Sequence, residues 1–273
     1  MIPPSTPPSS GAFDAVTVTL NPAVDVTITL PGFRQGHVNR AESLVSCPGG
    51  KGVNVAATLA DYGLHLAATG FLGKENSALF VDHFVEKRIA DYFYTVPGQT
   101  RSGIKIVDPV RRETTDVNLP GAAIGSTEFF RLRGLLRKLD AAWFVLSGSL
   151  PPGAPADAYA VLLKDLKARG VQVALDASGD ALRQALAEPP AVLKPNLAEL
   201  GELVGERLET PDDAVDAARL LLADGVGTVA VSMGEQGACF VSREEAVIAV
   251  PPPVTVHSTV GAGDAMVAGI VAA

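Results

Sequence analysis

A glycine-rich motif near the end of the chain is the clearest candidate for a reactive centre. The sequence Ser-Thr-Val-Gly-Ala-Gly-Asp ends at Asp264, and small apolar residues follow up to Ala273, which predicts a helix that begins here. The N–H groups of Gly261, Ala262 and Gly263 would point into the turn and form an anion hole for a transferring phosphoryl group. Asp264 could then accept the proton of an attacking hydroxyl. The alternative is an ordinary turn with a helix cap.

A second glycine-rich loop precedes another predicted helix. In the sequence Pro-Gly-Gly-Lys-Gly, Gly49 and Gly50 would let backbone N–H groups approach an anionic ligand, and Lys51 adds a cation. The spacing of a Walker loop is missing, and so is the hydroxyl after the lysine, which argues against that phosphate site. Asn54, one turn into the helix, could bind a sugar hydroxyl or cap the backbone.

Two arginines and an amide–carboxylate pair are further candidate ligands. Arg40 and Arg101 offer the planar, bidentate grip that suits phosphate, although an arginine on an exposed β layer is often only solvated. Asn196 and Glu199 are three residues apart and would share one face of a helix near its N-terminus. They would form an ordinary capping box or, as a functional pair, hold hydrated Mg²⁺.

The elements that must position these residues alternate between strand and helix, which predicts a doubly wound α/β fold with a mostly parallel sheet. Strands are expected at 16–20, 67–70, 143–146, 171–175, 192–193 and 228–231, and helices at 52–62, 77–88, 156–169, 196–204 and 211–223. Ligands bind such a sheet beyond the carboxyl ends of its strands. The polar and glycine residues that follow the apolar runs should therefore gather at one edge. They are Asn21, Asp25, Gly70, Gly73, Ser147, Ser149, Asp176, Lys194, Asn196, Ser232 and Gly234.

Three segments do not follow this alternation. Residues 25–47 and 92–118 are rich in Thr, Val and Ile with alternating polar positions, which predicts a small β-sheet lid over one end of the main sheet. Residues 1–12 are rich in Pro and Ser and are expected to be a disordered tail. We therefore expect one domain over residues 13–273.

Composition narrows the classes of partner and the compartment. The chain has 273 residues, 47% of them hydrophobic, and a net charge of −8 without a basic block, which argues against nucleic-acid and anionic-membrane partners. Cys47 and Cys239 are too few for a disulfide framework, which favours a reducing, cytoplasmic location. No apolar stretch is long enough to predict a bilayer span.

Taken together, six ordered motifs make the chain similar to a known family. They lie at 19–25, 48–56, 70–73, 147–151, 194–199 and 258–264. In order and spacing they resemble the PfkB (ribokinase-like) carbohydrate kinases, above all their phosphosugar branch. The resemblance implies transfer of the γ-phosphoryl of ATP to a phosphoketohexose, first of all fructose 1-phosphate to give fructose 1,6-bisphosphate. Tagatose 6-phosphate and fructose 6-phosphate are the alternative substrates.

The resemblance also implies a role for each candidate residue. Asp264 would be the catalytic base beside the anion hole of Gly261, Ala262 and Gly263. The residues implied to bind the substrate are Asp25, Gly49, Gly50, Lys51, Asn54 and Ser149 for the sugar, and Arg101 with Arg40 for its phosphate. The residues implied for ATP are Lys194, Asn196, Ser232, Gly234 and Gly237, and Glu199 would organise Mg²⁺. The lid of this family is often also a homodimer interface, so we expect a homodimer.

The chain departs from the family at its end. Family members continue for several helices beyond the position of Ala273, so these helices are expected to be absent here and the cover of the adenine to be reduced. A catalytically inactive phosphosugar-binding protein is therefore the alternative from another class. A kinase of neutral sugars or nucleosides is disfavoured by the cations Arg101 and Lys51. A dehydrogenase is disfavoured because no G-x-G-x-x-G follows the first strand.

Overall fold

The computed structural model describes residues 12–252 and 261–273. Most of the expected tail lies outside the described residues, as do Ser258, Thr259 and Val260 of the glycine motif. In the described part, no helix combines the length and apolar character needed to cross a membrane.

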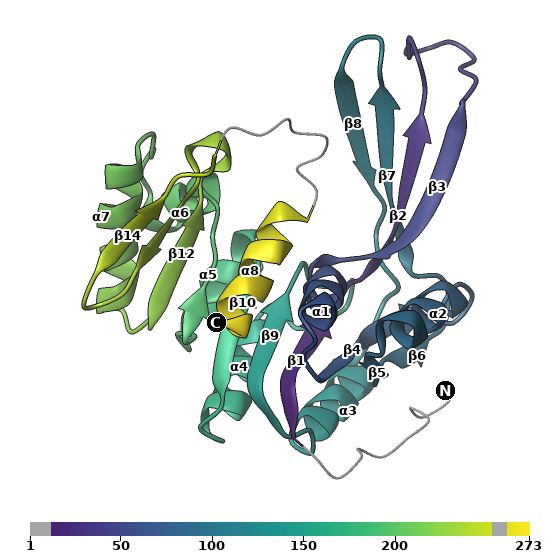
Figure 1. Cartoon of the computed structure of the whole chain (residues 1–273). Coiled ribbons are helices and arrows are strands. Elements are labelled where there is room, and N and C mark those ends of the chain that lie inside the picture. The colour runs from purple at the N-terminus through teal and green to yellow at the C-terminus, as the bar shows by residue number, and fades with distance from the viewer. Residues whose placement is uncertain (1–11, 253–260) are drawn as a thin grey trace.

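A ten-stranded sheet forms the centre of the molecule (Figure 1). Its order is β14-β13-β12-β11-β10-β9-β1-β4-β5, with β6 also paired to β4. The strands are β1 (Phe13–Thr19), β4 (Leu66–Gly73), β5 (Ala90–Asp91), β6 (Tyr94–Val96), β9 (Ala141–Ser147), β10 (Gln172–Asp176), β11 (Val192–Leu193), β12 (Thr228–Ser232), β13 (Ala238–Val241) and β14 (Ala246–Ala249). Pairing is parallel from β5 to β12 and antiparallel at the β13 and β14 edge. The expected doubly wound, mostly parallel sheet is confirmed.

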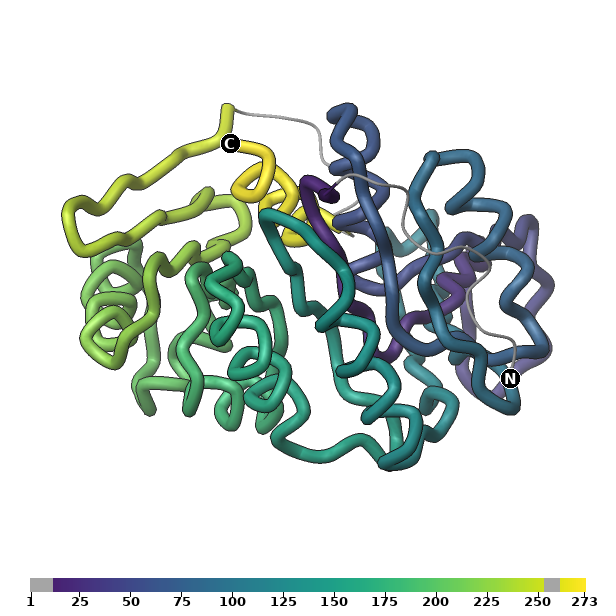
Figure 2. The backbone as a smooth tube through the Cα atoms, turned by 90° about the horizontal axis from the view of Figure 1, so that it is seen from below, coloured from purple at the N-terminus to yellow at the C-terminus, as the bar shows by residue number. Residues whose placement is uncertain are grey.

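Helices cover both faces of this sheet. One face carries α1 (Lys51–Asp61), α2 (Ala78–Lys87) and α8 (Ala262–Ala272). The other carries α3 (Ser126–Leu136), α4 (Ala158–Lys167), α5 (Gly179–Ala185), α6 (Leu197–Val204) and α7 (Pro211–Ala223). In Figure 2 the yellow α8 lies on the opposite side of the sheet from the teal and green helices.

Side-chain alternation in the central strands explains why polar groups reach the edge of the sheet. In β1, Val16 and Val18 join the core under α3 and α4, whereas Ala15 joins the core under α1 and α8. Successive side chains of a strand point to opposite faces, so Thr17 and Thr19 share the face of Ala15. At the carboxyl end Thr19 lies in register with Ser147 of β9, and Ser147 with Asp176 of β10. These polar side chains therefore form a row beneath α1.

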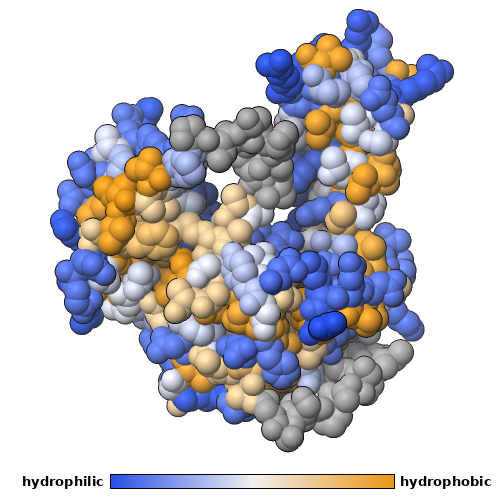
Figure 3. Space-filling model, in the orientation of Figure 1, coloured by the Kyte–Doolittle hydropathy of each residue, from blue (hydrophilic) through white to orange (hydrophobic). Residues whose placement is uncertain are grey.

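A separate four-stranded sheet projects from the body (Figures 1 and 3). Its order is β3-β2-β7-β8, formed by β2 (Ala23–Thr29), β3 (Ser43–Gly49), β7 (Arg101–Asp108) and β8 (Glu113–Asn118). This is the small sheet expected from the Thr, Val and Ile alternation. Its second segment is shorter than the predicted 92–118, because residues 90–96 pair with β4 in the main sheet.

The sequence prediction also missed several elements of the main domain. Helices α3 and α5 and the strands β13 and β14 were not expected. Glu128 Oε2 accepts the backbone N–H of Gly125 at 2.9 Å at the start of α3, which helps to explain where this helix begins. The four missed elements extend the layers that were predicted and leave the order of the central strands unchanged.

Candidate active site

The N-terminus of α8 carries the candidate base. Gly261 has a φ of 79°, a left-handed conformation that favours glycine, and the helix continues from Ala262 with Ala265 N–H donating to Gly261 O at 2.8 Å. The first N–H groups of a helix lack intrahelical partners, so those of Ala262 and Gly263 are available to an anion. Asp264 lies in this first turn and is only 7% exposed. The turn therefore places N–H donors and a buried carboxylate side by side.

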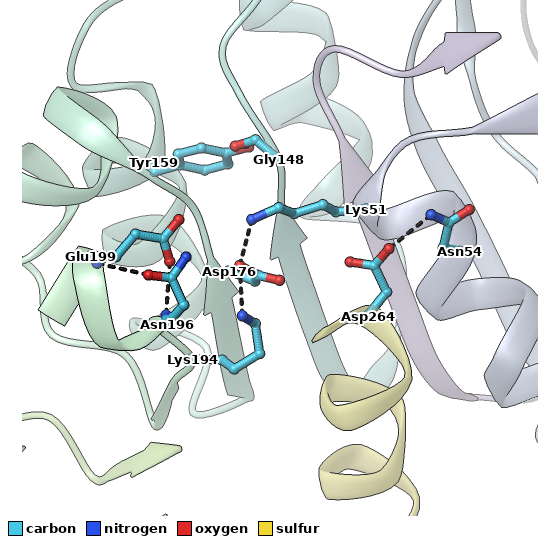
Figure 4. A network of polar contacts seen from close by, with 9 residues as sticks. All are labelled: Lys51, Asn54, Gly148, Tyr159, Asp176, Lys194, Asn196, Glu199 and Asp264. Carbon is cyan, nitrogen blue, oxygen red and sulfur yellow. Dashed lines mark hydrogen bonds and ion pairs between the residues drawn. The ribbon is translucent and has the colours of Figure 1, made fainter. Parts of the chain in front are cut away.

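Asn54 of α1 holds the carboxylate of Asp264. Its Nδ2 donates to Asp264 Oδ2 at 2.8 Å (Figure 4). Burial is the largest influence on Asp264 and raises its pKa above the usual range for aspartate, while the hydrogen bond from Asn54 acts in the opposite direction. Asp264 is thus a stronger proton acceptor than an exposed aspartate, and Asn54 keeps it from becoming neutral too readily.

The pH dependence of the reaction should report this contact. A base works only as the carboxylate, so the rate falls as the pH drops through the pKa of Asp264. Asn54→Ala removes a donor that favours the charged form, so that pKa should rise and the acid limb of kcat/KM should move to higher pH. Rate profiles of the wild type and the variant over the acid range measure the shift. A limb that stays in place or moves to lower pH would contradict the contact.

Asp176 at the end of β10 lies between two lysines (Figure 4). Its Oδ1 is 2.8 Å from Lys51 Nζ and 3.4 Å from Lys194 Nζ. Asp176 and Lys194 are almost completely buried, with side chains 1% and 5% exposed, whereas that of Lys51 is 36% exposed. A buried carboxylate therefore fixes two ammonium groups at the edge of the sheet, one from the α1 loop and one from the β11 loop.

The same cluster sets the charge state of Lys51. Burial is the largest influence and acts to lower its pKa, but the charge of Asp176 and its hydrogen bond outweigh burial. Glu199 and Asp264 add smaller effects in the same direction. The pKa of Lys51 thus lies above its usual value, and Lys51 is a permanent cation at neutral pH.

Lys194 lies next to the anion hole. A β-carbon built on Gly263 would be 3.4 Å from Lys194 Nζ. The ammonium group of Lys194 is thus within van der Waals contact of the first turn of α8. Asp264, Lys51, Lys194 and Asn54 come from α8, α1 and the β11 loop, and the fold brings all four together. From the sequence, Lys51 and Asn54 were assigned to the sugar and Lys194 to the nucleotide.

A second group of expected residues surrounds the base of the small sheet. The carboxylate of Asp25 lies against Gly49, where a β-carbon would collide with it, and 3.0 Å from the position of a β-carbon on Gly103. Burial raises the pKa of Asp25, and the charges of Lys105 and Arg101 oppose that rise. Asp25, the Gly49 backbone and Arg101 therefore belong to one site.

Loop contacts connect this group to the end of β9. Ser149 Oγ accepts a hydrogen bond from Asn21 Nδ2 at 3.0 Å, and Arg101 Nε donates to Asn21 O at 3.3 Å. Ser149 and Arg101, two expected ligands from separate segments, thus share one neighbour. Asn21 was expected at this edge of the sheet but was given no role.

The expected nucleotide ligands lie at the other end of the edge. Asn196 Oδ1 accepts from Glu199 N at 2.8 Å and Glu199 Oε2 accepts from Asn196 N at 2.9 Å, the capping box that was one of the two interpretations. Asn196 forms a parallel bridge with Ser232, which leads into the short turn with Gly234 at φ 60° and Gly237 at φ 90°. Asn196, Ser232 and the two glycines are therefore neighbours.

Arg40 does not join the group that contains Arg101. Arg101 pairs with Ala23 at the base of the small sheet, whereas Arg40 is in the exposed loop beyond Thr29 and Ser43 at its tip. Asp108 fixes that loop at the tip, because its carboxylate accepts N–H groups of residues 32 and 33. The expectation that both arginines hold one phosphate within one chain is wrong.

Asp176 is the functional residue that sequence reasoning overlooked. It follows an apolar strand, so it was expected at the sheet edge, but no ligand role was assigned to it. Its contact with Lys51 joins residues 125 positions apart, and nothing in the local sequence indicates that pairing.

Comparison with known proteins places this geometry in a family. The pfkB family of carbohydrate kinases matches residues 18–273. The chain is 49% identical to 1-phosphofructokinase of Rhodobacter capsulatus over 93% of this chain and 82% of that protein, and 45% identical to that of Xanthomonas campestris over 96% and 84%. The structure of phosphofructokinase-2 from Escherichia coli in complex with fructose-6-phosphate superposes with a TM-score of 0.89 at 32% identity, covering 95% of this chain and 86% of that one.

Proposed function

Because this chain belongs to the pfkB family of carbohydrate kinases, we propose that it phosphorylates fructose 1-phosphate with ATP to give fructose 1,6-bisphosphate. The observation that carries the proposal is the position of Asp264. A buried carboxylate with a raised pKa lies in the first turn of α8, beside the first N–H groups of that helix and two lysines. Relatives named 1-phosphofructokinase support the choice of substrate.

Each step of the transfer has a residue suited to it. Asp264 accepts the proton of the 6-hydroxyl as that oxygen attacks the γ-phosphorus of ATP. The N–H groups at the start of α8 and the ammonium groups of Lys51 and Lys194 balance the charge that gathers on the transferring group. Asp176 keeps the two lysines in place. Asp25 and the Gly49 backbone bind the sugar hydroxyls at the base of the small sheet, which covers the site against water.

ATP and Mg²⁺ fit the part of the sheet's carboxyl edge that lies beyond β11 and β12. Asn196, Ser232, Gly234 and Gly237 offer amide, hydroxyl and backbone groups to the nucleotide. Asp176 Oδ2 is buried and has no hydrogen-bond partner among the described residues, and the capping box uses Oε2 of Glu199, so the two carboxylates suit an ion that prefers oxygen ligands. No cluster of three acidic, His or Cys side chains occurs among the described residues, which fits an ion held mainly by phosphate and water. Bound Mg²⁺ would supply charge neutralisation to the phosphate oxygens.

The identity of the product tests the proposed function. Incubation with ATP and fructose 1-phosphate should convert the phosphomonoester signal in phosphorus NMR into the two signals of fructose 1,6-bisphosphate. ATP loss without a second sugar-phosphate signal would mean that water is the acceptor and would overturn the proposal.

Arg101 should distinguish phosphorylated from neutral substrates. Arg101→Ala should raise the KM for fructose 1-phosphate by roughly tenfold or more, because a hydrogen bond to a charged group is worth about 1.5–3 kcal/mol. The KM for ATP should barely change. Arg112→Ala, an exposed arginine on the β7–β8 turn, is the matched control. Equal changes in both KM values, or no change, would remove Arg101 from the phosphate site.

The small sheet supports a homodimer. Its cross-strand register places Leu44, Ile28 and Ile106 in one row on an apolar face, and Leu44 is 63% exposed. The opposite face carries Asp25 and Lys105, so a second copy on the apolar face leaves the site open to substrate. Burial of such a face is the usual reason for association.

Sedimentation should test this interface. Leu44→Lys places a charge in the apolar row and should shift the protein from dimer to monomer. Thr27→Lys, on the opposite face of the same sheet, is the control and should remain dimeric. A wild-type protein that sediments as a monomer at micromolar concentration would contradict the dimer.

A further inference from the structure

We propose that Asn21 is a positioning residue that prepares the phosphate subsite by orienting the hydrogen-bond donors of Ser149 and Arg101. The proposal rests on the proposed function, because it concerns the phosphate that the substrate already carries. Asn21 lies two residues after the end of β1, in the loop that leads to β2.

Asn21 connects three segments that are distant in the sequence. Its Nδ2 donates to Ser149 Oγ at 3.0 Å and, more weakly, to Leu150 O at 3.4 Å, both in the loop after β9. Its backbone O accepts from Arg101 Nε at 3.3 Å at the start of β7. Its Oδ1 lies so close to Gly121 that a β-carbon there would collide with it. The side-chain amide is thus fixed between the loop after β9 and the segment after β8, while the backbone carbonyl contacts the start of β7.

The contact with Ser149 determines where its hydroxyl proton points. A serine hydroxyl has one O–H donor and two acceptor lone pairs. Since one lone pair accepts the N–H of Asn21, the O–H is directed away from that amide. Ser149 is exposed, so the proton is presented to solvent or to an incoming anion. Asn21 therefore makes Ser149 a donor, which is the role that a phosphate oxygen needs.

Among the described residues, the hydrogen bond of the Arg101 guanidinium is made by Nε and not by its forked end. Nε is occupied by the backbone of Asn21, and the two Nη groups supply the parallel donors of a bidentate phosphate contact. Across residues 12–252 and 261–273, no carboxylate lies within ion-pair distance of Arg101. Burial acts to lower its pKa, with only Asp25 opposing it. A half-buried cation without a bound counter-charge is suited to a dianionic ligand.

A purely structural role for Asn21 would have different consequences. The amide could simply hold two loops together, and its loss would then weaken every property of the site alike. In the proposed role, removal of the Asn21 amide weakens only the binding of the substrate's phosphate. The loss of kcat/KM in Asn21→Ala, compared between a phosphorylated and an unphosphorylated substrate, therefore separates the two explanations.

The test compares fructose 1-phosphate with free fructose. Binding of fructose 1-phosphate without ATP is measured by titration calorimetry, and turnover is measured on both sugars. Asn21→Ala should weaken binding of fructose 1-phosphate and raise its KM about tenfold, the loss of one hydrogen-bonded donor to a charged group. The kcat on fructose 1-phosphate, the KM for ATP and kcat/KM for fructose should stay within about twofold. Gly121→Ala, which displaces the same amide through its β-carbon, should give the same pattern.

Two controls keep the result interpretable. Asn76→Ala removes an amide that makes two hydrogen bonds with the backbone of Thr100 beside Arg101, so it should lower Tm without changing the ratio between the two sugars. In a Ser149→Ala background, Asn21→Ala should weaken the binding of fructose 1-phosphate less than it does in the wild type. The Asn21 amide acts through the Ser149 hydroxyl, which that background lacks.

Each outcome decides one question. Equal losses on both sugars, or unchanged binding of fructose 1-phosphate, would overturn the role of Asn21. Additive effects of Asn21→Ala and Ser149→Ala would also overturn it. A wild type that binds fructose 1-phosphate but does not turn it over would contradict the proposed function, while the titrations would still decide the role of Asn21.

Discussion

Asp264→Asn should abolish turnover while leaving the binding of fructose 1-phosphate and ATP nearly unchanged. The substitution keeps the shape of the side chain but removes the proton acceptor at the start of α8. Loss of a general base costs about 10²–10⁴ in rate. Steady-state measurements of ADP release give kcat. Titration calorimetry gives the dissociation constants of fructose 1-phosphate and ATP.

The matched control for this variant is Asp180→Asn. Asp180 also lies in the first turn of a helix, α5, but its side chain is 86% exposed and pairs with Arg183 at 2.7 Å. That variant should keep the wild-type kcat. If Asp264→Asn retained more than about a third of kcat, a magnitude far outside the range for a lost base, Asp264 would not be the base.

Asp176→Ala should produce the largest loss of stability in the site. The change removes the carboxylate between Lys51 and Lys194 and leaves Lys194, 5% exposed, as a buried cation without its partner. Removing one partner of a buried ion pair costs about 3–5 kcal/mol. Chemical denaturation of the wild type and the variant at neutral pH measures the free energy of unfolding.

An exposed ion pair is the comparison for Asp176. Asp180→Ala breaks the surface contact with Arg183 and should change the free energy of unfolding by only about 0–1 kcal/mol. If both variants lost the same free energy of unfolding, Asp176 would not be the residue that neutralises the charges of Lys51 and Lys194.

Much of the site could be predicted because the fold dictates where strand ends meet. The carboxyl ends of parallel strands lie at one edge, so residues that directly follow apolar runs must gather there. Lys194 lies at the edge for this reason, because it directly follows β11. Lys51, Asn54 and Asp264 reach the same place from the first turns of α1 and α8. The glycines of the two loops were equally informative, because Gly263 and Gly49 leave space that a β-carbon would fill.

The remaining features depend on contacts that local sequence does not encode. Arg40 is in a Thr- and Val-rich segment like that of Arg101, and only the strand register shows that the two lie at opposite ends of the small sheet. Residues 90–96 have strand-like composition, but whether they pair with β4 or with the small sheet depends on tertiary packing. Asp176 and Asn21 stand at predicted edge positions, yet their partners come from distant loops.

The most direct test of the central claim is the rate of ADP release with three phosphoketoses side by side. The account predicts that kcat/KM is highest for fructose 1-phosphate, with fructose 6-phosphate and tagatose 6-phosphate well below it. It also predicts that ADP release with each sugar is lost in Asp264→Asn. A higher kcat/KM for either 6-phosphate would contradict the assigned substrate, and no sugar-dependent ADP release from a protein that binds both ATP and fructose 1-phosphate would contradict the kinase itself.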